Sequence, residues 1–285
     1  MRIGFQITKF NYPDVHQHLA EIARMVDDGG FYSLWVMDHY FQMEIIGGPD
    51  DPMLEAYTTL GYLAGLTKYV KLGVLITGVI YRYPSFLLKQ VTTLDVLSNG
   101  RAYFGIGAGW YEREARSLGF PFPSTRERFE QLEEILQIAH QLWRGDRTPY
   151  HGKHFSLPEP IFNPQPISQP HPPIMVGGEG EKKTLRMVAQ YGDACNINMR
   201  SIDFVRHKFN ILRQHCDTVG RDYSQIEKTL IGVAELSNGT QKIIEACHQY
   251  AELGVSQIIF GLSDYHDLKQ IEQLAEEIVP AVQAF

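Results

Sequence analysis

The chain has 285 residues, of which 44% are hydrophobic and 21% are charged, as in an ordinary globular enzyme. Its formal net charge of -7 offers no basic surface, which argues against a nucleic-acid partner. No apolar run approaches the roughly 20 residues that a bilayer crossing needs, so we expect no membrane partner. The first residues read as a strand rather than a signal peptide, and the three cysteines form no close pair. We therefore expect a cytoplasmic protein with reduced thiols.

Short apolar runs that favour strands alternate with amphipathic helical patterns along the whole chain. Leu19, Ile22, Ala23 and Val26, for example, recur at the three-to-four spacing of a helix with one buried face. The eight candidate strands are residues 3–7, 33–37, 70–77, 102–106, 174–176, 194–197, 229–233 and 257–260. Repeated strand–helix units predict parallel pairing with right-handed crossovers. We predict an α/β fold in which residues 1–285 form a single (β/α)8 TIM barrel, with an open doubly wound sheet as the alternative.

Two segments stand out from this alternation of strand and helix patterns. Ser124, followed three residues later by Glu127, predicts the capped start of a long helix. After that helix, residues 147–173 contain eight prolines and no helical period, so regular structure is unfavourable there. We interpret this segment as an insertion before the fifth strand, with a hairpin around HGKHFSL.

The residues that follow the second strand are the first candidates for chemistry, because active sites of such barrels lie at the carboxyl ends of the strands. Asp38 and His39 stand there in the segment VMDHYF. An imidazole transfers protons near neutral pH, and we expect the adjacent carboxylate to orient it or a cofactor ring. The alternative is that Asp38 caps a turn and His39 only fills the rim.

A glycine-rich turn follows the fifth strand. Gly177, Gly178 and Gly180 allow close backbone approach, and a helix predicted to begin near Glu181 would direct its amide groups at an anion such as a phosphate. The charges of Glu179 and Glu181 must then face away. A plain strand-to-helix turn is the alternative, since the pattern is neither a P-loop nor GxGxxG.

The segment GIGAGWYERE follows the fourth strand. Its glycines lack the spacing and the position of a dinucleotide fingerprint, so we expect them to let a flat ring lie against the strand end, with Trp110 as its wall. Glu112 and Glu114 are second-choice acid–base groups after His39. The two histidines of HGKH lack further ligands at metal-site spacing, so no metal is predicted. Cys195 lies in an apolar strand and reads as a packed thiol.

Together these motifs resemble the luciferase-like superfamily, and within it the branch of coenzyme F420-dependent (deazaflavin) oxidoreductases. The resemblance rests on VMDHYF, on the block from KLGVLITGVIYRYP to GIGAGWYEREAR, on HPPIMVGG and on KKTLRMVAQYGDACNI. It implies a TIM barrel with the cofactor along the rim, a cis non-prolyl peptide at Leu75-Ile76 or within one residue of it, and a histidine at His39 beside the reacting ring carbon. The implied cofactor-binding residues are Asp38, His39, Leu75, Ile76, Thr77, Gly107, Ala108, Gly109, Arg113, Gly177, Gly178, Glu179 and Gly180.

Two departures refine the implied function. Trp110 stands where sugar-phosphate dehydrogenases of the branch place a carboxylate, which argues against glucose 6-phosphate as the substrate. Gly177-Gly178-Glu179-Gly180 replaces the small-hydroxyl motif of many FMN-binding members, which favours F420 over FMN. The resemblance thus implies hydride transfer between a deazaflavin and a small organic molecule. The alternatives are an FMN-dependent monooxygenase served by a partner reductase, and a non-catalytic flavin-binding relative; a homodimer is expected in each case.

Overall fold

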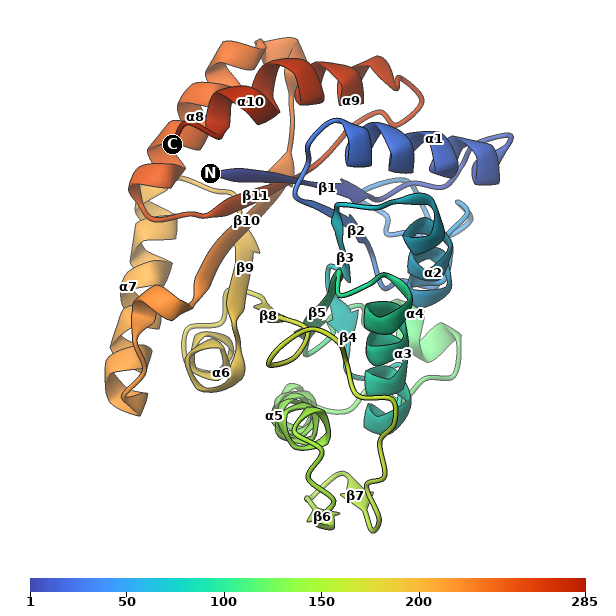
Figure 1. Ribbon diagram of the computed structural model, residues 1–285, viewed down its shortest axis with the longest axis vertical. Coiled ribbons are helices and arrows are strands. Elements are labelled where there is room, and N and C mark those ends of the chain that lie inside the picture. Colours follow the sequence, from blue (N-terminus) through green and yellow to red (C-terminus); the bar gives the residue numbers. More distant parts are fainter.

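The computed structural model describes residues 1–285 and forms a closed parallel β-barrel (Figure 1). Pairing between β3 and β5, through Leu72 opposite Ala102, completes the ring and excludes the open sheet. The predicted TIM barrel is confirmed. In chain order, the barrel strands are β1 (Arg2–Ile7), β2 (Ser33–Val36), β3 (Lys71–Val74), β4 (Thr77–Gly78), β5 (Ala102–Gly107), β8 (Ile174–Gly177), β9 (Ala194–Asn198), β10 (Glu227–Val233) and β11 (Gln257–Gly261).

The third barrel strand differs from its prediction. Residues 70–77 were expected to form one continuous strand, but β3 and β4 are separate segments. The break between them contains the cis peptide Leu75-Ile76, the bond that the family resemblance indicated. Gln6 Nε2 donates a buried hydrogen bond of 2.9 Å to Leu75 O at this break. The break lies at the carboxyl end of the strand, where the candidate site is expected.

Helices cover the outside of the barrel (Figure 1). Three of them, α2, α5 and α7, begin with side-chain caps, and Ser124 and Glu127 form the predicted capping box at the start of the longest helix. The helices are α1 (Val15–Asp28), α2 (Ala56–Leu66), α3 (Pro84–Leu97), α4 (Glu112–Ser117), α5 (Thr125–Trp143), α6 (Thr184–Tyr191), α7 (Ile202–Val219), α8 (Thr240–Glu252), α9 (Lys269–Gln273) and α10 (Val279–Val282). A single π-helical turn, Leu274–Ile278, joins α9 to α10. None of the helices combines the length and apolar character that a bilayer crossing requires.

The proline-rich insertion contains the predicted hairpin. β6 (Tyr150–His151) and β7 (Ser156–Leu157) pair antiparallel and project beyond α5 in Figure 1. His151 Nδ1 lies 3.1 Å from Ser156 Oγ, and His154 Nε2 lies 3.0 Å from Glu130 Oε2. Both histidines thus make local contacts. No group of three or more His, Cys, Asp or Glu side chains is arranged to hold a metal ion.

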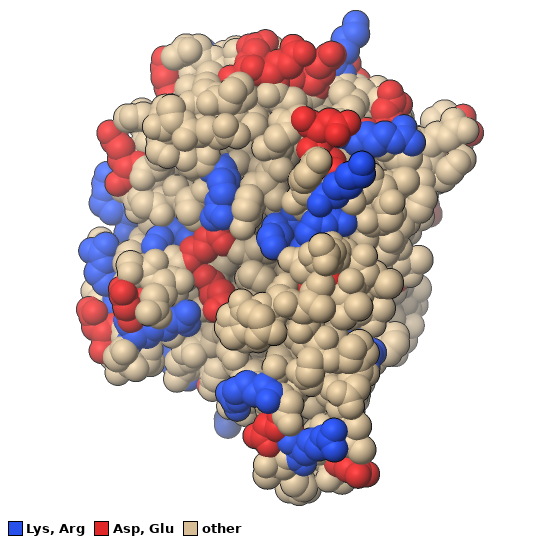
Figure 2. All heavy atoms as spheres, viewed as in Figure 1, with Lys and Arg blue, Asp and Glu red and all other residues tan.

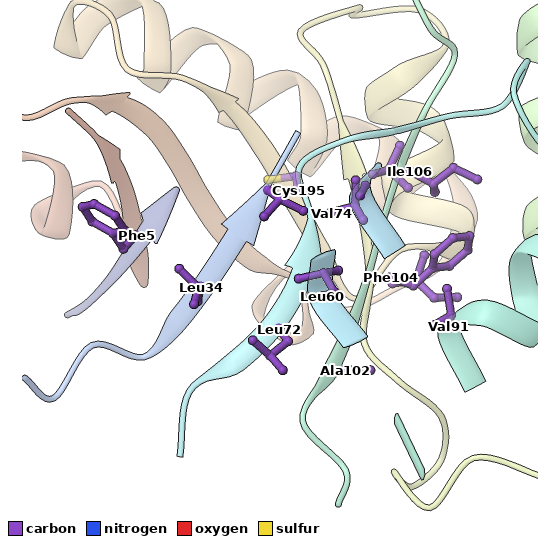
Figure 3. Close-up of a cluster of buried hydrophobic side chains, with 14 of the residues drawn as sticks. Phe5, Leu34, Leu60, Leu72, Val74, Val91, Ala102, Phe104, Ile106 and Cys195 are labelled. Carbon is purple, nitrogen blue, oxygen red and sulfur yellow. The ribbon is translucent and has the colours of Figure 1, made fainter. Parts of the chain in front are cut away.

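The core occupies the space between the barrel and its helices. Figure 3 shows Phe104 and Ile106 of β5 among side chains of the neighbouring strands and helices, including Val91 of α3. The predicted face of α1, from Leu19 to Val26, is buried in the same core. Cys195 of β9 is also buried there, and burial raises the pKa of its thiol to about 12, so it is a packed thiol. Packing of the helices on the strands thus holds the carboxyl ends of the strands in place, and the candidate site is built from these ends.

Candidate active site

A cavity of about 870 Å³ opens at the carboxyl ends of the barrel strands. All eight barrel positions contribute to its wall through the ends of their strands or the segments that follow, from Thr8 after β1 to Leu262 after β11. This volume is near the upper end of the roughly 300–1,000 Å³ of small-molecule sites, and it suits a cofactor together with a small substrate. The candidate site therefore lies where the barrel fold predicts it.

His39 lines this cavity and is paired with a carboxylate from a distant segment. Its Nδ1 lies 3.1 Å from Glu114 Oε2, although 75 residues separate the two in the chain. Glu114, on α4, is fully buried and also accepts hydrogen bonds from Tyr81 OH and from the backbone N–H groups of Tyr40 and Phe41. A carboxylate on Nδ1 selects the tautomer that leaves Nε2 as the other functional atom of the ring.

Burial and hydrogen bonding have opposing effects on the pKa of Glu114. Burial by itself would raise the pKa of this carboxyl, but hydrogen bonds from His39 and Tyr81 and the attraction of His39 hold its pKa below the usual value. Glu114 is therefore ionised at neutral pH. Because it lies behind His39 and outside the cavity wall, its place is that of a positioning group rather than of a proton donor to a ligand.

Asp38 does not orient His39, contrary to one of our expectations. Its two carboxylate oxygens accept hydrogen bonds of 2.8 and 2.9 Å from Arg82, and Gly78 N donates another at 3.0 Å. Arg82 also donates to Glu55, the residue that caps α2. Burial raises the pKa of Asp38, and the bonds from Arg82 and Gly78 oppose that rise. Asp38 lines the cavity but chiefly fastens the end of β2 to β4.

The floor of the cavity is formed by Leu75, Ile76 and Thr77, with the glycines of the neighbouring strands beside them. A Cβ atom on Gly177 would lie 2.5 Å from Ile76 Cγ1, and one on Gly107 would lie 2.9 Å from Ile76 Cγ2. These two glycines therefore make room for the Ile76 side chain. We had expected them to admit a ligand directly, so their role in shaping the floor is a different one.

The glycine turn after β8 reaches the cavity at Gly177 and Gly178 but not at Glu179 or Gly180. Gly178 has a φ of 122°, a conformation that favours glycine. Helix α6 begins at Thr184, three residues later than the predicted Glu181, because residues 181–183 form a separate turn. Thr184 lines the cavity, so the amino end of α6 faces it.

The acidic residues of this turn do not line the cavity. Glu179 accepts a 2.9 Å hydrogen bond from Asn198 Nδ2, and Glu181 accepts one of 2.6 Å from Lys208 Nζ. His207 lies 3.1 Å from the same oxygen of Glu181. The negative charges that would oppose an anion in the turn are thus paired with other groups.

Arg128 is a cavity residue that sequence reasoning missed. It is only 8% exposed, its Nη1 donates to Pro123 O at 2.6 Å, and its Nε has no hydrogen-bond partner. Thr125, Arg128 and Phe129 line the cavity from the first turns of α5, where the i, i+3, i+4 spacing puts them on one face. Arg128, a buried cation with an unpaired N–H, thus lines the same cavity as Gly178 and Thr184, and we call these three residues the cradle, since their N–H groups suit an anion.

The remaining predicted residues divide between the cavity and the surface. Gly107, Ala108 and Gly109 line the cavity, as does Trp110, whose ring centroid lies 5.8 Å from that of His39. Glu112 is exposed and pairs with Arg116, and Arg113 pairs with Glu44. Neither Glu112 nor Arg113 lines the cavity.

A half-buried histidine paired with a buried carboxylate, facing a cofactor-sized cavity at the rim of a TIM barrel, is an arrangement that suits a cofactor-dependent barrel enzyme. Residues 1–278 match the model of the luciferase-like monooxygenases, and the chain belongs to this family.

Similar proteins agree with this assignment. An F420-dependent glucose-6-phosphate dehydrogenase of Kineococcus radiotolerans is 28% identical over 262 residues, which are 91% of this chain and 75% of that protein. The oxygenase component of a flavin-dependent trigonelline monooxygenase of Acinetobacter baylyi is 25% identical over 217 residues, 75% of this chain and 56% of that protein. Both are redox enzymes, and the chain is an oxidoreductase.

A solved structure shows the same fold. An F420-dependent secondary alcohol dehydrogenase, in complex with an F420-acetone adduct, superposes with a TM-score of 0.84 over 99% of this chain and 98% of that chain. The two sequences are 20% identical. This likeness concerns the barrel as a whole.

Proposed function

We propose that this protein is a coenzyme F420-dependent oxidoreductase that transfers a hydride between the deazaflavin ring and a small organic substrate. The observation that carries the proposal is the pair of His39 and Glu114, which presents an imidazole to a cavity large enough for a cofactor and a substrate. Such a pair supplies the proton transfer that accompanies hydride transfer to or from a carbon–oxygen bond.

The residues of this chain fit the cofactor at two places. Leu75, Ile76 and Thr77 form the floor for a ring, and the cradle of Gly178, Thr184 and Arg128 offers N–H groups to its phosphate. Both F420 and FMN carry a ring and a phosphate, so these places fit either one. The similarity to F420-dependent proteins and the sequence Gly177-Gly178-Glu179-Gly180 support F420.

The proton is handled by His39. When bound, the deazaflavin supplies the ring carbon that accepts or releases the hydride. In the direction of substrate oxidation, His39 Nε2 takes the proton of the substrate, because Glu114 occupies Nδ1. Glu114, ionised beside the ring, stabilises the imidazolium that forms. In the direction of reduction, the same nitrogen returns the proton.

Cofactor binding is the direct test. Titration of the purified protein with F420 and with FMN, followed by fluorescence quenching, should show tighter binding of F420. Arg128→Met should weaken F420 binding by about 10–100-fold, since a hydrogen bond to a charged group contributes roughly 1.5–3 kcal/mol. Arg126→Met is the matched control, because Arg126 lies on the same helix but is exposed and pairs with Glu130. Tighter binding of FMN would contradict the proposal.

An FMN-dependent monooxygenase is the second candidate, and the similarity to the trigonelline monooxygenase component supports it. It would need dioxygen and a reductase that delivers reduced FMN. Oxygen consumption with chemically reduced FMN separates it from the F420 enzyme. A non-catalytic relative would bind one of the cofactors without turnover. The homodimer stays a separate prediction.

A further inference from the structure

Large apolar side chains are exposed around the mouth of the cavity. Ile45 is 86% exposed, Trp110 is 59% exposed and Val233 is 46% exposed, and all three line the cavity. Ile45 and Trp110 lie in the segments that follow β2 and β5, and Val233 is the last residue of β10, so the three come from different sides of the barrel. We call these three residues the apolar rim. Exposed apolar groups gathered around a cavity indicate contact with an apolar ligand.

Further apolar side chains line the cavity next to the apolar rim. Met37, Met43 and Tyr111 form a small hydrophobic cluster of their own, with Ile46 packed against it, and all four line the cavity. Methionine side chains adapt to ligands of different shape because they are unbranched and flexible. The Trp110 ring stacks on Tyr111 at 4.9 Å between centroids and meets His39 edge-on. The apolar surface therefore reaches the proton-transfer group.

Charged groups on this part of the wall are few. Lys9 Nζ donates to Ser263 O at 2.9 Å, and Glu235 adds a negative charge after β10. The other cation of the wall, Arg128, belongs to the cradle. Figure 2 draws the face on which the amino end of β1 lies, where acidic and basic side chains are interspersed; the mouth of the cavity, at the carboxyl ends of the strands, is not on that face. A phosphate or carboxylate on the substrate would thus meet one cation, already bonded, together with a carboxylate.

We infer that the substrate is an uncharged alcohol with apolar substituents, or the ketone or aldehyde derived from it, and that the apolar rim selects it. This inference rests on the proposed function, which supplies the two-electron acceptor. In oxidation, the carbinol C–H bond breaks and its electron pair leaves with the hydride to the deazaflavin. The O–H bond breaks, its proton goes to His39 Nε2, and the carbonyl bond forms.

Kinetics with a graded series of alcohols test the inference. With F420 as the acceptor, kcat/KM should rise by about fourfold for each added methylene from 2-propanol to 2-pentanol, as the transfer of a methylene out of water predicts. Glucose 6-phosphate and lactate should react at least tenfold more slowly than 2-pentanol. Equal or faster reaction of either anion would overturn the inference and leave the proposed function intact.

Variants of the apolar rim test whether these residues cause the rise in kcat/KM along the alcohol series. Ile45→Asp should abolish the increase along the series while F420 affinity stays unchanged, because Ile45 follows β2, whereas the cradle residues belong to α5, α6 and the turn after β8. Ile161→Asp is the matched control, since Ile161 is an exposed isoleucine in the insertion and does not line the cavity. It should retain the full increase. An Ile45→Asp enzyme that still shows the full increase would contradict the role of the apolar rim.

A binding measurement without a cofactor separates the two proposals. Trp35 and Trp143 are buried, so Trp110 is the tryptophan whose fluorescence responds to a ligand at the mouth. Cyclohexanol should shift the emission to shorter wavelength at lower concentration than lactate or glucose 6-phosphate does, and Trp110→Phe should lack the shift. This result would support the substrate class even if F420 failed to bind. A stronger response to either anion would overturn it.

Discussion

Two buried carboxylates near the rim, Asp38 and Glu114, have contrasting surroundings. Asp38 is bonded to Arg82, a permanent cation, and to the backbone of β4. Glu114 is bonded to His39, whose charge depends on protonation, and to the backbone of residues 40 and 41. Both carboxylates thus fix the chain just after β2. Only Glu114 has a partner that exchanges protons.

The difference indicates separate tasks for the two sites. A carboxylate paired with arginine keeps its charge compensated and holds the backbone in place. A carboxylate paired with a cavity-lining histidine compensates a charge that appears during proton transfer. The Asp38 pair should therefore matter most for stability and the Glu114 pair most for turnover. Substitutions at each site test this division.

The largest effect is expected for His39→Ala. Turnover should fall by about 10²–10⁴-fold, the usual contribution of a general acid–base group, while cofactor affinity changes little. Steady-state kinetics with a reactive alcohol and a cofactor titration measure the two quantities. His154→Ala, in the hairpin of the insertion, is the control and should behave as the wild type.

His39→Asn sharpens this test, because an amide can hold the hydrogen bond to Glu114 but cannot move a proton. Normal turnover in both His39 variants would refute the catalytic role. Loss of the cofactor in both would make His39 a binding residue.

Arg82→Met should mainly affect stability. It leaves Asp38 buried without its cation, which costs about 3–5 kcal/mol in the free energy of unfolding. Without Arg82, only the hydrogen bond from Gly78 opposes the rise that burial causes in the pKa of Asp38. The loss of stability should therefore be smaller at pH 5 than at pH 8, because at pH 5 the carboxyl binds a proton more readily and is not buried as an anion. Urea unfolding at both values measures this. The double variant Asp38→Asn/Arg82→Met should recover part of the stability; no recovery would exclude an isolated charge as the cause.

The smallest effect is expected for Glu114→Gln, with turnover lowered by about 10–100-fold, the range known for partners that orient metal-binding histidines. The pH profile of kcat for alcohol oxidation should shift to lower pH, because protonated His39 loses its anionic partner. A merely structural role would leave that profile unchanged.

The stability effect of Glu114 has a defined sign. Its pKa is below the usual value in the folded state, so the carboxylate stabilises the fold above the unfolded pKa of about 4.5, and this contribution disappears as pH falls through the lower folded pKa. Wild type and Glu114→Gln should therefore differ more in unfolding free energy at pH 7 than at pH 3. An equal difference at both values would contradict the ionised, hydrogen-bonded carboxylate.

Local sequence patterns determined much of the fold and part of the site. The apolar runs placed the barrel strands, and the spacing of Ser124 and Glu127 predicted the cap of α5 because capping acts over three residues. His39 and Gly178 could be expected in the cavity wall, since both follow strands whose carboxyl ends share one rim. The division of the third strand into β3 and β4 left no periodic signal and was missed.

Only the tertiary structure decided which side chains meet. Asp38 is adjacent to His39 in sequence, but side chains of neighbouring residues at a strand end point in different directions, and Asp38 turns to Arg82. Glu114 reaches His39 across 75 residues, because closure of the barrel brings the segment after β5 beside the segment after β2. Arg128 enters the cavity for the same reason, from α5. Sequence patterns record local geometry, whereas distances between separate strand ends depend on the register and closure of the whole barrel.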